Sequence, residues 1–370
     1  MSIMRLLFVE DERDSIEPVL NLLKKSGDYE TEVKCFVQAR DALETMTITP
    51  DVIVLDLLEK GASAESETPG LQTFDWVWKS RFCPIVIYSA QPDLCEVNHP
   101  FVKKVTKGRG SPDQVDAVLR EFRPHVEALH EVEKQIRQQF ATALRHVAPY
   151  AFGVCGEGES EKLNDMILRA GRRRLAALMD NDSRHGQKLA DWEQYLFPPV
   201  SEDLTLGDIL REKGKDDPAS FCVVLTPSCD LVASGGREPK VSSVLLARCC
   251  AINDAIKLTS LGEMGWTKLQ NHLPPKLSQG YFETILPLPA LKDLIPHMAA
   301  NLKDLAVVPF QEIKERFDVV ASVDSPFREL VAWAYMQVAC RPGLPDRDFK
   351  QWGERIIEHL KEATSDGKKG

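Results

Sequence analysis

The sequence contains no apolar run of about 18 residues, the length that a membrane-spanning helix needs. Its first residues, MSIMRLLFVEDE, become acidic too early for a secretory signal peptide. Basic residues are in the minority, since 46 Lys and Arg stand against 56 Asp and Glu and the formal net charge is -10. This balance disfavours a nucleic-acid-binding protein that works through overall charge. We therefore expect a cytoplasmic protein without membrane or DNA partners. The densest basic cluster, Arg172, Arg173 and Arg174, is interpreted as a solvated helix face in preference to a phosphate-binding surface.

Cysteines follow no paired spacing. There are nine, an odd number, scattered along the chain and often inside apolar runs. This usage is typical of reduced thiols in a core and not of a disulfide framework. The sequence also shows no glycine-rich phosphate loop and no helix-turn-helix pair with a basic recognition helix, which disfavours the common DNA-binding output.

The first third of the chain alternates short apolar runs with helical patterns. The runs cover residues 5–9, 32–36, 52–56, 85–89 and 102–106. Strands separated by helix-length segments indicate right-handed crossovers and a parallel sheet. We predict a flavodoxin-like (βα)5 doubly wound domain over residues 1–123. The segment AQPDLCEVNHP, after the fourth run, is a poor helix and predicts a short or irregular fourth crossover.

Polar side chains follow the ends of these predicted strands. Glu10 and Asp11 follow the first, Asp56 ends the third, Ser89 ends the fourth and Lys107 follows the fifth. Ligands of open α/β sheets bind at the carboxyl ends of the strands. Three carboxylates would repel one another without a hard cation, and oxygen ligands suit Mg²⁺. A lysine and a hydroxyl beside the metal would serve a phosphoryl group.

These motifs, LLFVEDE, DVIVLDLL, PIVIYSA and VTKG, resemble the receiver domain of two-component response regulators. The resemblance implies that Asp56 is the nucleophile phosphorylated by a histidine kinase. It also implies that Glu10, Asp11 and Asp56 bind Mg²⁺, that Ser89 hydrogen-bonds the phosphoryl oxygens, and that Lys107 pairs with the phosphate.

Three features differ from the family pattern. The span from Asp56 to Gly70 is longer than usual and contains the polar stretch EKGASAESETPG. Lys104 occupies the position of the usual switch aromatic, and Gly108 replaces the proline that customarily follows the lysine. We therefore expect phosphorylation without the usual Ser/Thr-to-aromatic switch.

Residues 124–190 read as a helical connector. Apolar residues recur every three or four positions, at 126, 129, 132, 136, 140, 144 and 147, which predicts a helix that follows Pro124. The stripe over residues 125–147 favours two interpretations equally. One is a signalling helix that forms a homodimer or docks on the output domain, and the other is a helix packed on its own chain.

Residues 191–370 predict an α+β domain with a β-rich core. The runs SFCVVLTPSCDLVASGG and KVSSVLLARCCAI indicate antiparallel strands on either side of Gly-Gly. GYFETILPLP and DLAVVPF add shorter strands, and helices are expected from about 326 to 340 and from about 346 to 363.

The stretch TPSCDL holds the strongest candidates for chemistry in this domain. Cys229, followed by Asp230, could be a nucleophile with His272 as its base. A zinc site is the alternative, although the spacing lacks a CxxC knuckle; its ligands would come from Cys222, Cys229, Cys249, Cys250 and His272. The structural interpretation, in which Cys229 packs at a strand end and Asp230 caps a turn, is favoured over both.

TPSCDL, SPFRELVAWAY and RPGLPDRDF together weakly resemble an uncharacterised module of bacterial phage-defence proteins. That resemblance implies no activity, but it makes Arg328 and Arg341 candidates for testing. Arg328 is more simply explained as an ion pair with Glu329.

The leading hypothesis is a response-regulator-like signalling protein in which phosphorylation of Asp56 controls a C-terminal output or interaction domain, with an anti-phage role implied by the second resemblance. One alternative is a phosphate sink that competes with another receiver for the kinase. Another is an enzyme in the C-terminal half, gated by the receiver.

Overall fold

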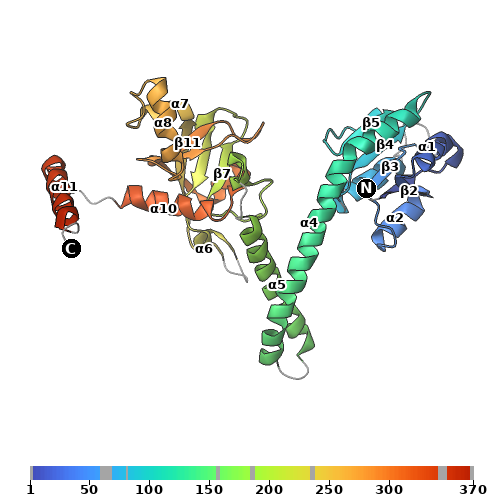
Figure 1. Ribbon diagram of the computed structural model, residues 1–370, viewed down its shortest axis with the longest axis horizontal. Coiled ribbons are helices and arrows are strands. Elements are labelled where there is room, and N and C mark those ends of the chain that lie inside the picture. Colours follow the sequence, from blue (N-terminus) through green and yellow to red (C-terminus); the bar gives the residue numbers. More distant parts are fainter. Residues whose placement is uncertain are drawn as a thin grey trace. The chain divides into compact units, whose positions relative to one another are not determined.

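The structure is a computed structural model that describes residues 3–58, 69–80, 82–155, 159–183, 188–233, 238–340 and 348–366. The chain divides into two compact units, Met1–Gln187 and Lys188–Gly370 (Figure 1). The predicted division at residues 123 and 190 stays a prediction, and each unit is described by itself.

The N-terminal unit contains a five-stranded parallel sheet. Its strands are β1 (Met4–Val9), β2 (Tyr29–Lys34), β3 (Val52–Leu55), β4 (Ile85–Ser89) and β5 (Val102–Thr106), in the order β2-β1-β3-β4-β5. This order confirms the predicted flavodoxin-like fold. The second strand ends two residues earlier than predicted, because Phe36 begins the next helix and is buried in the core.

Helices cover both faces of this sheet. The first face packs against α1 (Arg13–Ser26) and α4 (Ser111–Val154), and the second against α2 (Phe36–Glu44) and α3 (Pro69–Ser80). β1 contributes to both cores, since Leu6 and Phe8 face one side and Leu7 and Val9 the other, as expected for a strand buried on both faces. The β4–β5 connection holds a 3₁₀ turn, η1 (Pro92–Leu94), where the sequence predicts a poor helix.

Helix α4 differs from the prediction at two points. The segment SPDQ predicts Ser111 as the N-cap, but the helix starts at Ser111 and its N-cap is Gly110. It also continues through Pro124, where a second helix was expected to begin. Proline removes one backbone hydrogen bond, but the apolar stripe that packs on the sheet runs unbroken across it, with Phe122 before and Val126 after.

The far part of α4 packs on its own chain. α5 (Ser160–Ser183) contacts α4, and the two helices lie side by side in Figure 1. Gly171 permits the close approach, since a Cβ there would lie 3.0 Å from the Leu144 side chain and 3.7 Å from Phe140. The intrachain interpretation therefore holds for this end of the stripe. Val132 and Ile136, nearer the middle, are 47% and 41% exposed.

The C-terminal unit is built on a seven-stranded antiparallel sheet of order β10-β11-β9-β8-β7-β12-β6. The pairing of β8 with β9 confirms the predicted antiparallel strands around Gly-Gly. The strands are β6 (Tyr195–Leu196), β7 (Asp208–Glu212), β8 (Phe221–Val224), β9 (Ser243–Ala251), β10 (Ile285–Leu288), β11 (Met298–Pro309) and β12 (Phe317–Val323).

Short helices complete this unit. They are η2 (Asp191–Gln194), η3 (Pro218–Ser220), α6 (Ser228–Leu231), α7 (Ile252–Lys257), α8 (Trp266–Leu277), α9 (Phe310–Arg316), α10 (Phe327–Ala339) and α11 (Phe349–Asp366). One face of the sheet packs against α10 through Val331, Ala334 and Val338, and the other against α9 through Ile313. In the described part of both units, no helix combines the length and the apolar character needed to cross a membrane.

Candidate functional site

The candidate site lies where the parallel sheet changes its winding direction. In the order β2-β1-β3-β4-β5 the chain winds outward in opposite directions from β1 and β3, which leaves a crevice at their carboxyl ends. Glu10 follows β1 and Asp56 follows β3, and these residues are only 5% and 6% exposed. Two buried carboxylates therefore meet at the place where this fold binds ligands.

The ammonium group of Lys107 joins the two carboxylates. Its Nζ donates to Asp56 Oδ2 at 2.6 Å and forms a very short contact with Glu10 Oε2. A third donation reaches Ser15 Oγ, in the first turn of α1, at 3.2 Å. Lys107 thus occupies the position of a cation between two anions, as buried carboxylates require.

Backbone amides hold the carboxylates in place. Asp56 Oδ1 accepts from the N–H of Leu57 at 2.7 Å and of Leu58 at 3.2 Å. Glu10 Oε1 accepts from the N–H of Glu12 at 2.9 Å. One oxygen of each carboxylate is fixed by the main chain, so the other is aimed at Lys107.

Burial and ion pairing shift the pKa values of Glu10 and Lys107 in opposite directions. Burial raises the pKa of Glu10, and the hydrogen bond from Lys107 offsets only part of that increase. Burial alone would lower the pKa of Lys107, but the hydrogen bonds to Asp56 and Glu10 outweigh it and raise that pKa overall. The lysine therefore stays charged at neutral pH.

Ser89 is fully buried at the end of β4, with Thr106 as its neighbour on β5. Its carbonyl accepts from the N–H of Lys107 at 2.9 Å, which brings the hydroxyl-bearing residue and the lysine to the same edge of the sheet. The sequence prediction that these residues gather at one edge agrees with this geometry.

Asp11 is exposed and does not complete a three-carboxylate cluster, because no group of three or more Asp, Glu, His or Cys side chains in the described ranges is arranged to hold a metal ion. Hard carboxylate oxygens from Glu10, Asp56 and the adjacent Asp11 nevertheless suit Mg²⁺ by their chemistry. In this arrangement the Lys107 ammonium provides the positive charge that such an ion would bring.

Sequence reasoning missed Ser15 and Tyr88. Tyr88 precedes Ser89; its ring lies under Lys107, with Nζ 5.7 Å from the ring centroid, and its hydroxyl lies 2.7 Å from Ser111 Oγ. The position of Ser15, one helical turn after the acidic pair, was an available signal. Lys104 occupies the position of the usual switch aromatic. Its Nζ lies 3.9 Å from Asp93 Oδ1, in a weak ion pair.

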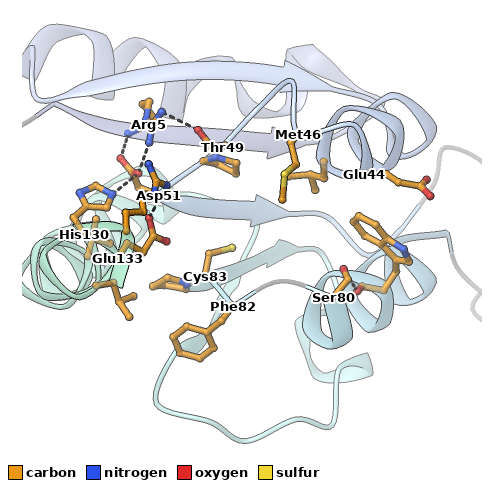
Figure 2. A pocket seen from close by; sticks show the side chains of 17 residues that line it. Arg5, Glu44, Met46, Thr49, Asp51, Ser80, Phe82, Cys83, His130 and Glu133 are labelled. Carbon is orange, nitrogen blue, oxygen red and sulfur yellow. Dashed lines mark hydrogen bonds and ion pairs between the residues drawn. The ribbon is translucent and has the colours of Figure 1, made fainter. Parts of the chain in front are cut away.

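A cavity of about 970 Å³ lies at the opposite end of the sheet (Figure 2). There Asp51, whose side chain is 2% exposed, accepts from the backbone N–H of Arg5 at 2.7 Å and from its guanidinium at 3.2 Å. His130, on α4, lies 2.9 Å from Asp51 Oδ1. This cluster connects α4 beyond Pro124 to the strand starts, away from the Asp56 site.

Replacing Asp51 by alanine should lower the stability of the N-terminal unit by about 2–3 kcal/mol, because it removes a buried charged acceptor from its hydrogen bonds with Arg5 and His130. Urea unfolding measures the change. Thr49→Ala is the matched control, since Thr49 accepts one exposed hydrogen bond from the same arginine at 2.9 Å. Equal effects of the two substitutions would contradict a structural role for the Asp51 cluster.

The described structure gives no support to a catalytic or zinc site at the C-terminal cysteine candidates. Cys229 is exposed on α6, where its thiol lies 3.6 Å from Asp230, and Asp230 also pairs with Lys240 at 3.3 Å. His272 is exposed on α8. Burial raises the pKa of Cys222 to about 11 and that of Cys249 as well, which makes both thiols inert. The zinc alternative receives no support among the described side chains, Cys250 included.

Arg328 has a structural contact in place of the expected ion pair. Its Nε donates to the carbonyl of Val323 at 3.0 Å, at the end of β12. Glu329 accepts from the hydroxyl of Ser325 at 3.1 Å, so the expected pairing of Arg328 with Glu329 is wrong. Arg341 lies outside the described residues.

Comparisons with known proteins give partial likenesses. No family model and no curated protein matches the sequence. The N-terminal domain of a response regulator/sensory box/GGDEF 3-domain protein from Carboxydothermus hydrogenoformans is 22% identical over 35% of this chain and 98% of its own, with a TM-score of 0.26. NtrX from Brucella abortus in complex with ADP is 19% identical over 40% of this chain and 35% of its own, with a TM-score of 0.28.

A third similar structure, a yeast Spc42 trimeric coiled-coil segment fused to another structure, is 19% identical over 50% of this chain and 99% of its own, with a TM-score of 0.29. The fold assignment depends on the strand order of the sheet and not on these similarities.

Proposed function

We propose that the N-terminal unit is a receiver-like phosphoacceptor domain in which Asp56 takes a phosphoryl group from a histidine kinase in the presence of Mg²⁺. The observation that carries this proposal is the convergence of Asp56, Glu10 and Lys107 at the β1/β3 switch point, with Ser89 at the same edge.

Each side chain has a distinct part in the transfer. As the phosphorus–nitrogen bond to the kinase histidine breaks, a phosphorus–oxygen bond forms to the Asp56 carboxylate, and the electron pair of the broken bond stays on the histidine ring. Two backbone amides orient the Asp56 carboxylate. Lys107 exchanges its contact with the carboxylates for one with the phosphoryl oxygens, and Ser89 donates to another.

Mg²⁺, held by Asp56 with Glu10 and Asp11, would neutralise charge on the transferring group. The phosphoryl group then adds negative charge where Lys107 now balances two carboxylates, which changes the local ion pairing. We propose that this change controls an interaction made by the C-terminal unit. In the described part of that unit, no group of three or more His, Cys, Asp or Glu side chains is arranged to hold a metal ion. An anti-phage role stays a prediction from the sequence.

Incubation with acetyl phosphate and Mg²⁺ should add one phosphoryl group to the native chain, as measured by intact mass. Asp56→Asn, which preserves the shape of the side chain, should abolish the gain, and chelation of Mg²⁺ should do the same. Phosphorylation of Asp56→Asn to the native level would place the acceptor elsewhere. A folded native chain that accepts no phosphoryl group from the donor or from any kinase would refute the proposal.

A further inference from the structure

Helix α11 presents an apolar face with no described partner. Phe349, Trp352, Ile356 and Ile357 are 66%, 52%, 48% and 54% exposed. Their spacing places them on one side of the helix, and the rings of Phe349 and Trp352 stack with centroids 6.4 Å apart. Helices of this length gain most of their stability from burying such a face, so this one requires a covering surface.

A second apolar stripe runs along α10. Leu330, Trp333 and Met336 follow one another at three-residue spacing, and Trp333 and Met336 are 47% and 53% exposed. The ring of Tyr281 packs edge-on against Trp333, with centroids 5.3 Å apart, and holds it in place. The stripe runs toward the carboxyl end of α10, after which the chain continues to α11.

The stripe also leads into a cavity of about 820 Å³ at the amino end of α10. Leu330 and Phe327 form part of its wall, so the stripe and the cavity share a residue. Leu273 and Leu277 of α8 and Leu286 of β10 also line the cavity, and its lining is mostly apolar. An apolar strip, formed by Leu330, Trp333 and Met336, therefore extends along α10 from this cavity toward the carboxyl end of the helix.

We propose that α11 packs antiparallel along α10 of the same chain and covers this strip. Nine residues, 340–348, join the two helices, a connection short enough to keep α11 close to α10. Phe349 and Trp352 would then contact Met336 and Trp333, and Ile356 would lie at the mouth of the cavity.

The distances along the two helices match. At about 1.5 Å per residue, the six residues from Leu330 to Met336 span about 9 Å and the seven from Phe349 to Ile356 about 10 Å. A tethered helix also competes at a high effective concentration against a free ligand or a second copy. A small apolar ligand in the cavity would leave Trp333, Met336 and the apolar face of α11 exposed, so α11 is the occupant that explains all three surfaces.

Cross-linking tests this arrangement in the full chain. In a Cys229→Ser/Cys340→Ser background, Met336→Cys combined with Phe349→Cys should give an intrachain product with a short bis-maleimide. Met336→Cys with Gln351→Cys should not, since Gln351 is about 200° around α11 from Phe349. Interchain products would mean that a second copy covers the strip, and equal yields in the two pairs would mean that α11 does not dock; either result overturns the proposal.

Dye binding provides a second readout. Ile356→Asp/Ile357→Asp should raise the fluorescence of 1-anilinonaphthalene-8-sulfonate severalfold, because it uncovers the cavity, while Arg355→Asp/Glu358→Lys should leave it unchanged. The altered residues are all exposed on α11, so the core stays intact, and far-UV circular dichroism checks this. Strong dye binding to the unaltered chain, without a further rise in Ile356→Asp/Ile357→Asp, would show that the cavity is already open and would reject docking.

Discussion

Replacing Lys107 by alanine is expected to destabilise the N-terminal unit by about 3–5 kcal/mol in the absence of Mg²⁺, because it leaves buried charge without its partner. Glu10 and Asp56 would then face each other at the β1/β3 switch point with no cation between them. Thermal or urea unfolding of the native chain and the variant measures the loss. Lys103→Ala is the matched control on the same strand: its pair with Glu121 is largely exposed and should contribute less than about 1 kcal/mol.

Mg²⁺ should reverse much of this loss. A divalent ion can take the place of the ammonium group, so Mg²⁺ should raise the melting temperature of Lys107→Ala more than that of the native chain, where Lys107 competes with it. A larger Mg²⁺ effect on the native chain would contradict competition at one position. A small effect of Lys107→Ala, equal to that of Lys103→Ala, would contradict the buried ion pair.

Alkaline pH gives an independent check of the same pair. The folded-state pKa of Lys107 is raised, so its contribution to stability is present at neutral pH and is lost as pH rises through that raised pKa. Above neutral pH, the stability difference between the native chain and Lys107→Ala should therefore shrink only once the solution is strongly alkaline. A difference that disappears near neutral pH would contradict the raised pKa.

The site residues in the N-terminal unit could be predicted because a parallel sheet brings strand ends together. Once the apolar runs are assigned to strands, Glu10, Asp56, Ser89 and Lys107 must gather at one edge, whatever the loops do. The detailed pairing could not be predicted, because it depends on side-chain reach: Lys107 bridges two carboxylates, while Asp11, the residue after Glu10, is exposed.

The ends of the helices and the chemistry of the C-terminal unit were harder to predict from the sequence, because both depend on tertiary contacts. Pro124 is a local signal for a helix boundary, but the apolar stripe that packs on the sheet is a tertiary signal, and the helix follows the tertiary signal. Around Cys229 the sequence shows which residues are near in the chain, whereas a catalytic or zinc site depends on which strands pair. The structure buries Cys222 and Cys249 and leaves Cys229 exposed, which no spacing rule could show.

Gly70→Ala is expected to destabilise the N-terminal unit by at least about 1–3 kcal/mol. It should also impair phosphoryl transfer. Gly70 is the second residue of α3 and is buried. A Cβ atom there would lie 2.3 Å from the Cα of Leu57 and 2.5 Å from the carbonyl oxygen of Asp56. Both are backbone atoms, so the clash cannot be relieved by a rotamer change and must move the segment that carries Asp56.

The displacement should show in two measurements. Unfolding experiments report the lost stability, and the rate of phosphoryl transfer from acetyl phosphate reports the position of Asp56, because the two amides that orient its carboxylate belong to Leu57 and Leu58. Gly153→Ala in α4 is the matched control, since no atom lies within 4 Å of its added Cβ and a helical Gly-to-Ala change is stabilising by about 0.5–1 kcal/mol. If Gly70→Ala lost stability but kept the native transfer rate, α3 would move instead of the Asp56 segment, and the acceptor would be held by its strand alone.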